Sequence, residues 1–79
     1  MTVEVRLFAG LARYITGAGN GEPIEVSLIE PSTVSDLLGQ LNIPEKEAFL
    51  TIVNGMALPH STVLENGDRV GIFPAIGGG

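Results

Sequence analysis

The residues of this chain that could do chemistry are few, and most of them stand alone. Cysteine is absent, which excludes thiolate zinc sites, cysteine-ligated iron–sulfur clusters and thiol nucleophiles. His60 is the only histidine, and we interpret it as an ordinary loop residue, because neither a metal site nor a general base works without partners. Glu45 and Glu47 flank a lysine and are more typical of a solvated face than of a catalytic pair. Ser61-Thr62 indicates a local cap or turn, since no base is identified that would activate a hydroxyl.

One group remains, the carboxylate at the end of a glycine-rich tail. The tail has six residues, which are Pro74, Ala75, Ile76, Gly77, Gly78 and Gly79. Glycine-rich ends also occur in linkers and expression scars, and that alternative stays open. Glycine carries no Cβ and can lie in a narrow channel, and six extended residues reach roughly 20 Å. The terminal carboxylate could therefore enter a site on another protein.

Length and charge limit the partners that the chain can take. At 79 residues with 44% hydrophobic content, the sequence predicts a single domain over residues 1–79 with a flexible tail at 74–79. The formal net charge of −5 repels nucleic-acid phosphates and favours a protein partner with a basic docking surface. No apolar run approaches the ~20 residues of a membrane span, and the N-terminus lacks a secretory signal pattern. We therefore expect a cytoplasmic protein that binds no nucleic acid directly and enters no membrane.

Two segments near the N-terminus alternate with the period of a half-buried strand. Residues 3–8 place two valines and a leucine on one side and Glu4, Arg6 and Phe8 on the other, and residues 24–29 repeat the pattern. Together they predict a hairpin whose long connection, residues 9–21, contains about one helical turn. Phe8 falls on the solvent side, so it is either available to a partner or covered by the connection.

The middle of the chain predicts one amphipathic helix. Thr33 followed by Asp36 is a capping-box-like start, in which side-chain oxygens accept from the unpaired amides of the first turn. Apolar residues follow at the spacing of one helix stripe, and Asn42 and Pro44 end it. We expect this helix to cover the inward face of a sheet.

The C-terminal half predicts further strands. Residues 51–54 and 69–73 have strand patterns, and residues 56–58 form a short edge strand after a turn. In the last strand Phe73 falls on the same outward side as Arg69. The whole order predicts an α+β fold, a mixed sheet of four to five strands with one main helix on one face and the first and last strands as central neighbours.

A series of short motifs runs through the chain, comprising Leu7-Phe8-Ala9, Arg13, Gly17, Ser32-Thr33-Val34, Val53-Asn54-Gly55, the run from Leu64 to Val70, Phe73-Pro74 and Gly78-Gly79. In this order they resemble the sulfur-carrier family with the ubiquitin-like β-grasp fold, over essentially the whole chain. The long connection at residues 9–21 makes the chain more similar to molybdopterin synthase small subunits than to thiamine sulfur carriers. It departs from the family at Ala75, where a second proline is common, and at Gly77, where another residue is common.

The resemblance implies a carrier protein that has no catalytic residues and binds no cofactor or metal. A ubiquitin-activating-like enzyme would use ATP and magnesium to adenylate the carboxylate of Gly79, the residue after Gly78. A sulfurtransferase would then replace the AMP with sulfur to give a thiocarboxylate. The large subunit of molybdopterin synthase would receive the tail and pass the sulfur to precursor Z. We expect the free carrier to be a monomer.

The resemblance and the strand pattern together predict a partner interface. Its members are Phe8, Leu58 and Phe73 as an exposed apolar patch, with the tail residues Pro74, Ala75, Ile76 and Gly77. Two alternatives stay open for the function. The chain could carry sulfur for thiamine, tRNA thiolation, cysteine or a tungsten cofactor, or it could be a ubiquitin-like tag or docking module.

Overall fold

A computed structural model of the protein describes residues 1–15 and 19–75. Five strands, one α-helix and two short 3₁₀ helices follow one another along this part of the chain. Their bounds are β1 (Thr2–Leu7), η1 (Leu11–Tyr14), β2 (Ile24–Ser27), α1 (Val34–Gln40), η2 (Glu45–Glu47), β3 (Leu50–Val53), β4 (Met56–Ala57) and β5 (Arg69–Phe73). Among these residues no helix is long and apolar enough to cross a membrane.

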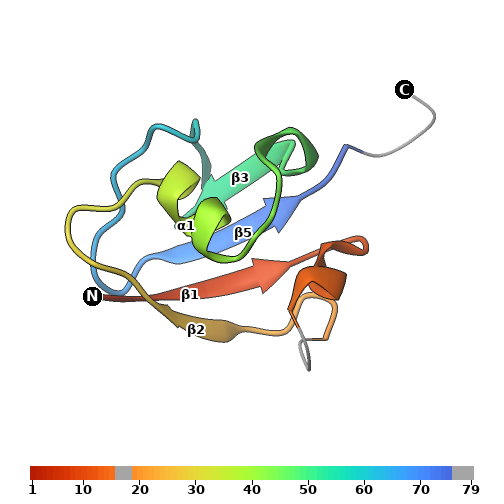
Figure 1. The fold of residues 1–79 in the computed structure, drawn as a ribbon, viewed down its shortest axis with the longest axis horizontal. Coiled ribbons are helices and arrows are strands. Elements are labelled where there is room, and N and C mark those ends of the chain that lie inside the picture. Colours follow the sequence, from red (N-terminus) through yellow and green to blue (C-terminus); the bar gives the residue numbers. More distant parts are fainter. Residues whose placement is uncertain (16–18, 76–79) are drawn as a thin grey trace.

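The strands form one mixed sheet in the order β2-β1-β5-β3-β4. β1 and β5 are parallel neighbours at its centre, and every other pairing is antiparallel. Both central arrows therefore point toward the same end of the molecule (Figure 1). The predicted sheet is confirmed, including its central pair.

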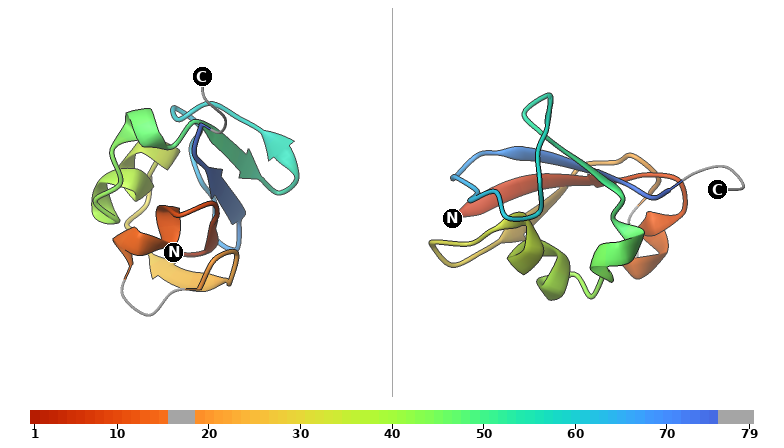
Figure 2. Two further views of the ribbon diagram at one scale, coloured as in Figure 1. Left: turned by 90° about the vertical axis from the view of Figure 1, so that its right-hand side faces the viewer. Right: turned by 90° about the horizontal axis from the view of Figure 1, so that it is seen from above.

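The helices gather on one face of the sheet. Seen from above, α1, η1 and η2 all lie below the strands, and the other face carries no helix (Figure 2). We call this second surface the open face. The arrangement is the predicted β-grasp, with one main helix packed on a mixed sheet.

The core lies between the sheet and α1. The side chains that the alternation of β1 assigned to the inside are at most 1% exposed, as are Val34, Leu37 and Leu38 of the helix stripe, while Leu41 at its end is partly buried. The central members of the core are Val3, Val5, Leu7, Leu11, Val34, Leu37, Leu38, Val70 and Ile72. Leu11 comes from η1, so the connection at residues 9–21 contributes to the core through its predicted helical turn.

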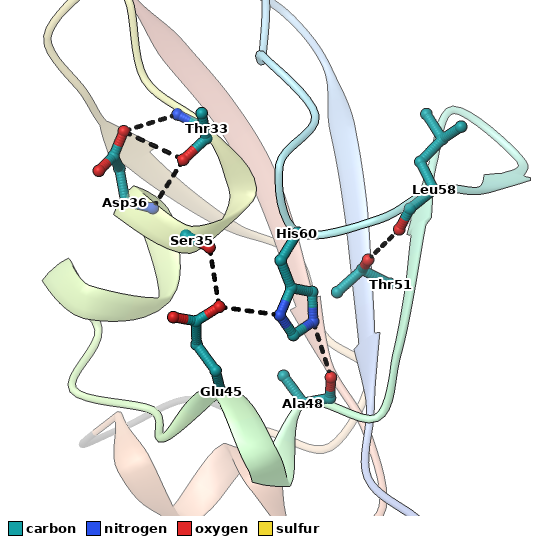
Figure 3. Close-up of polar contacts among 8 residues, drawn as sticks. All are labelled: Thr33, Ser35, Asp36, Glu45, Ala48, Thr51, Leu58 and His60. Atoms are coloured by element: carbon teal, nitrogen blue, oxygen red, sulfur yellow. Dashed lines mark hydrogen bonds and ion pairs between the residues drawn. The ribbon is translucent and has the colours of Figure 1, made fainter.

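The helix begins and ends where its sequence signals stand. The Thr33 hydroxyl accepts from the Asp36 amide at 3.2 Å, and the Asp36 carboxylate accepts from the Thr33 amide at 2.8 Å (Figure 3). This reciprocal pair is the capping box, which supplies partners for two otherwise unpaired amides. At the other end Asn42 takes a positive φ of 61° two residues before Pro44, which closes the helix.

Several segments differ from the prediction. β1 and β3 each begin and end one residue earlier than predicted. The strand predicted over residues 24–29 ends at Ser27, and Ile29 is 82% exposed, because the chain turns there and Ser32 donates its hydroxyl to the Ile29 carbonyl. The edge strand predicted over residues 56–58 is shorter, although the Leu58 amide still donates to the Thr51 carbonyl. The element η2 was predicted only as a polar segment.

Candidate functional site

Two phenylalanines stack where the central strands end. The parallel register pairs Leu7 with Ile72, so the next residues, Phe8 and Phe73, stand side by side on the open face. The Phe8 amide still donates to the Ile72 carbonyl at 3.1 Å. The two ring centroids are 4.4 Å apart and the ring planes are parallel to within 1°. The stack therefore extends the β1–β5 association beyond its last backbone hydrogen bond.

Glycines beside the stack let the rings lie close to the backbone of the sheet. A Cβ placed on Gly71 would meet Phe73 Cε1 at 3.4 Å and Phe8 Cε2 at 3.5 Å. A Cβ on Gly21 would meet Phe8 Cε1 at 3.0 Å, and Gly21 also has a positive φ of 75°. Both rings are consequently half-buried. The connection at residues 9–21 touches Phe8 through Gly21 and leaves part of the ring accessible. Phe8 is thus neither fully covered by the connection nor fully exposed, which lies between the two predicted alternatives.

A shallow hollow opens beside the stack on the open face. It encloses about 460 Å³, and we call it the open-face hollow. Phe8, Phe73, Ile52 and Gly71 line it with apolar or small groups, and Glu4, Arg6, Asn54 and Arg69 contribute polar groups. The combination of aromatic rings, a small residue and charged side chains suits a protein surface with an apolar anchor and a charged rim.

Leu58 does not join this surface, which corrects the prediction of one apolar patch with Phe8 and Phe73. Its backbone pairs with Thr51, a residue that is 2% exposed, and its carbonyl accepts from the Thr51 hydroxyl at 2.6 Å (Figure 3). Leu58 packs against the core, because the β3–β4 register turns it toward the helix side. Two apolar residues that the prediction did not include lie on the open face instead, Leu50 opposite Phe73 and Ile52 opposite Gly71. Their alternation with two buried residues, Thr51 and Val53, was the signal for this.

The predicted tail begins directly after the stack. Pro74 is half-buried and Ala75 is exposed. The remaining predicted site residues, Ile76, Gly77, Gly78 and Gly79, lie outside the described residues. The described structure therefore shows where the tail leaves β5, at Pro74 and Ala75.

His60 and Glu45 form a structural junction among three segments. One ring nitrogen of His60 lies 3.0 Å from Glu45 Oε1 and the other lies 2.9 Å from the Ala48 carbonyl oxygen, while Ser35 donates to Glu45 at 2.8 Å (Figure 3). The hydrogen bonds from Ser35 and His60 hold the pKa of the Glu45 carboxyl below its ordinary value. This junction joins α1, η2 and the segment after β4, in keeping with the interpretation of His60 as an ordinary residue.

Glu47 faces a different set of partners. It accepts from the Tyr14 hydroxyl at 2.7 Å and from the Arg13 guanidinium at 2.6 Å. The Tyr14 hydrogen bond, with a further contribution from Arg13, lowers the pKa of Glu47, and the same bond raises the pKa of Tyr14. Glu45 and Glu47 thus anchor η2 to separate elements and do not form a pair. Within residues 1–15 and 19–75, no three acidic or imidazole side chains cluster in a way that could hold a metal ion.

A family model and several solved structures match this chain. Residues 5–79 match the model of the ThiS family. SAMP1 from Haloferax volcanii is 27% identical, with a TM-score of 0.70 and complete coverage of both chains. A Pyrococcus furiosus protein assigned as molybdopterin converting factor subunit 1 is also 27% identical, with a TM-score of 0.70 over 96% of this chain and 99% of that one.

A third solved structure is a complex. It contains subunits 1 and 2 of the molybdopterin-converting factor from Helicobacter pylori, and the matched chain is 25% identical, with a TM-score of 0.61 and complete coverage of both chains. A search of curated protein sequences finds no significant match.

Proposed function

We propose that this chain, which belongs to the ThiS family of ubiquitin-like sulfur carriers, delivers sulfur to molybdopterin synthesis as a thiocarboxylate on Gly79. Proteins of this kind are carriers and not enzymes. The observation that carries the proposal is the family match itself, because it extends from β1 through the glycine tail. The proposal includes Gly79 as the end of the mature chain.

The chemistry must come from partner proteins. A free carboxylate, ionised above a pKa of about 3.5, is a poor electrophile. In the proposed first step a carboxylate oxygen of Gly79 attacks the α-phosphorus of ATP, held with magnesium by an adenylating enzyme, and pyrophosphate leaves. Hydrosulfide then attacks the carbonyl carbon of the mixed anhydride, AMP leaves, and loss of the S–H proton gives the thiocarboxylate. If a sulfurtransferase persulfide supplies the sulfur instead, AMP leaves in the same way, and a thiol then cleaves the S–S bond of the acyl disulfide and is itself oxidised to a disulfide.

The position of the tail supports this role. The Phe8–Phe73 stack fixes the end of β5, and the six residues of the tail follow from a defined point. Extended, residues 74–79 reach roughly 20 Å at about 3.3 Å each, which is enough to enter a channel in a second protein. Glycine at the last three positions keeps that segment narrow.

Two of the similar structures support molybdopterin synthesis as the pathway. The Pyrococcus furiosus and Helicobacter pylori structures are assigned to the molybdopterin converting factor, and the second of them holds subunits 1 and 2 together. By analogy, we propose that the large subunit of molybdopterin synthase is the sulfur acceptor of this chain. A ubiquitin-activating-like enzyme would be its first partner, and the free carrier would be monomeric.

A second candidate function follows from the similarity to SAMP1. A structure of that protein is described as small archaeal modifier protein 1. The same activated Gly79 could then form an isopeptide bond with lysines of other proteins. Intact-mass and peptide mass spectrometry of the protein from its native cell separates the two functions, since a carrier shows one oxygen-to-sulfur exchange at Gly79 and a modifier shows a Gly79–lysine linkage.

Removing the last two glycines tests the proposed site directly. The chain without Gly78 and Gly79 should fold as the full chain does, because the tail lies beyond β5, and should not be adenylated by the activating enzyme of the same organism. The measurement is formation of the acyl adenylate by intact mass, with unfolding followed by circular dichroism. Replacing Gly78 by valine, which keeps the length and charge, should also block the reaction. Adenylation of the shortened chain at the normal rate would show that the site is wrong.

A further inference from the structure

The open-face hollow contains a cation without an internal partner. Within the described residues, Arg6 pairs with Glu4 at 3.1 Å and Arg13 pairs with Glu47 at 2.6 Å. The guanidinium of Arg69 makes no ion pair or hydrogen bond within this part of the chain, although it lines the hollow. A charged head group in this state is available to a group from outside the molecule.

The acidic side chains nearest to Arg69 in the sheet are already committed. Glu4 is its direct neighbour in the β1–β5 register, but the Glu4 carboxylate accepts from Arg6. Asp68 precedes Arg69 and accepts from the Asn54 amide group and from the Glu65 backbone amide, both at 2.8 Å. Although Glu4 lines the same hollow, no carboxylate of the described residues forms an ion pair with the Arg69 guanidinium.

The backbone of Arg69 is held while its head group is free. The Arg69 backbone amide donates to the Asn54 side-chain oxygen at 2.9 Å, and the Arg69 carbonyl accepts from the Asn54 backbone amide at 2.8 Å. The start of β5 is thus anchored to the β3–β4 turn, in which Asn54 and Gly55 both have positive φ. Because this backbone is already held, binding of the head group orders only the side chain and not the main chain.

Apolar neighbours strengthen the case for a buried contact. Gly71, Ile52 and the two stacked rings line the same hollow as Arg69. When a partner covers this surface, water leaves the hollow, and the Coulomb attraction within an ion pair there is stronger than on an open surface, while leaving either charge unpaired becomes costly. Arginine also offers two parallel donors that match the geometry of a carboxylate.

We infer that Arg69 binds an aspartate or glutamate side chain of the proposed large synthase subunit when that protein docks on the open face, and that this contact helps to select that protein. The inference rests on the proposed function for the identity of the docking protein. The chain carries a net charge of −5, so a complementary partner surface is mainly basic. An acidic residue of the partner opposite Arg69 would be an exception on this basic surface. It would fix how the two proteins align, and it would disfavour partners whose surface is uniformly basic, because these would place a cation against Arg69.

Charge variants of Arg69 test the inference. We expect Arg69→Glu to weaken binding by about tenfold or more, Arg69→Gln to weaken it by less, and Arg69→Lys to retain part of the affinity. Binding is measured by titration calorimetry against two purified proteins of the same organism, the large synthase subunit and the adenylating enzyme. Lys46→Glu is the matched control, since it changes the net charge equally and lies on η2, on the helix side of the sheet. Thermal melts of every variant report on folding.

A reciprocal change provides the decisive result. An acidic residue of the partner that cross-links to position 69 is replaced by arginine, and this should restore binding to Arg69→Glu. If the wild-type chain binds and folded Arg69→Glu and Arg69→Gln bind as tightly, the inference is wrong while the proposed function stands. If the wild-type chain binds neither protein, the proposed function fails and the inference fails with it. An equal loss with Lys46→Glu would assign the effect to net charge and would also overturn the inference.

Discussion

The stacked rings of Phe8 and Phe73 lie beside Gly71, which is on the same face of the sheet. A Cβ at Gly71 would be in ordinary van der Waals contact with both rings. The alternation of the two strands was sufficient to predict that Phe8, Phe73 and Arg69 share a face, because side chains of a strand alternate strictly. It did not predict that the rings stack, since stacking depends on the parallel register of β1 and β5.

The face of the sheet on which Leu58 lies could not be predicted from its own residue type and position. Its orientation is set by the hydrogen bonds to Thr51 across the β3–β4 pair, and a shift of register by one residue would place it on the other face. The sequence of β4 is too short to specify that register by its own pattern.

Truncation of one ring tests the role of the stack. Because the Phe73 ring is half-buried, we expect Phe73→Ala to cost about 1–2 kcal/mol of folding stability, less than the roughly 3–5 kcal/mol of a core phenylalanine. As an interface anchor the same ring should contribute about 2 kcal/mol or more to binding. Chemical denaturation and calorimetry against the proposed large subunit measure the two quantities.

Ile29→Ala is the control for that experiment, since Ile29 is an apolar residue that is 82% exposed and does not line the open-face hollow. It should fold and bind nearly as the wild type does. A severe loss of stability in Phe73→Ala together with unchanged affinity would place the ring in the core and remove it from the interface.

At the scale of elements, short sequence patterns predicted those features that are stabilised by interactions between residues close together in the chain. The capping box of α1 spans four residues, and the turn at Asn54-Gly55 needs only two residues with positive φ. The element η2 depends instead on partners far away in the sequence. His60 is 15 positions from Glu45, and Tyr14 is 33 positions from Glu47, so no local pattern could indicate that this polar segment is ordered.

The junction at Glu45 predicts a dependence of stability on pH. Its hydrogen bonds from Ser35 and His60 lower the carboxyl pKa in the folded state below that of the unfolded state. The stabilisation is therefore present above about pH 4.5 and is lost as the pH falls through the lower folded pKa. We expect Glu45→Gln to be less stable than the wild type at about pH 5.5, with a difference that narrows at about pH 3.

Urea unfolding at the two pH values measures this effect. Ser35→Ala removes one donor to Glu45 and should show a smaller difference of the same sign. A stability difference between wild type and Glu45→Gln that stays constant over this range would contradict the linkage.

At the scale of the molecule, the order of elements led to the correct sheet, because a helix between two hairpin-like pairs must cover one face of a shared sheet. The sequence predicted the net charge of the chain but not where the charged side chains lie or which of them are paired. The structure shows that two of the arginines are paired internally, while Glu22, Glu25, Glu30 and Glu65 are exposed acidic side chains. The surface field is thus dominated by carboxylates, with Arg69 as a local exception.

This charge distribution predicts a strong effect of salt on association. Complementary fields accelerate encounter with a basic partner, and salt screens exposed charges beyond about 8–10 Å. Raising the salt from about 50 to 300 mM should reduce the association rate constant with the large subunit by about tenfold, with a smaller change in the dissociation rate constant. Stopped-flow kinetics across this range measures both constants.

The double variant Glu22→Gln and Glu25→Gln separates steering from contact energy. Both side chains are exposed, so their neutralisation should leave the fold intact, lower the association rate constant at low salt and reduce its salt dependence. Arg69→Gln, in contrast, should act mainly on the dissociation rate constant, because its contact forms only after docking. An association rate constant that is insensitive both to salt and to the double variant would show that the acidic surface does not guide the partner.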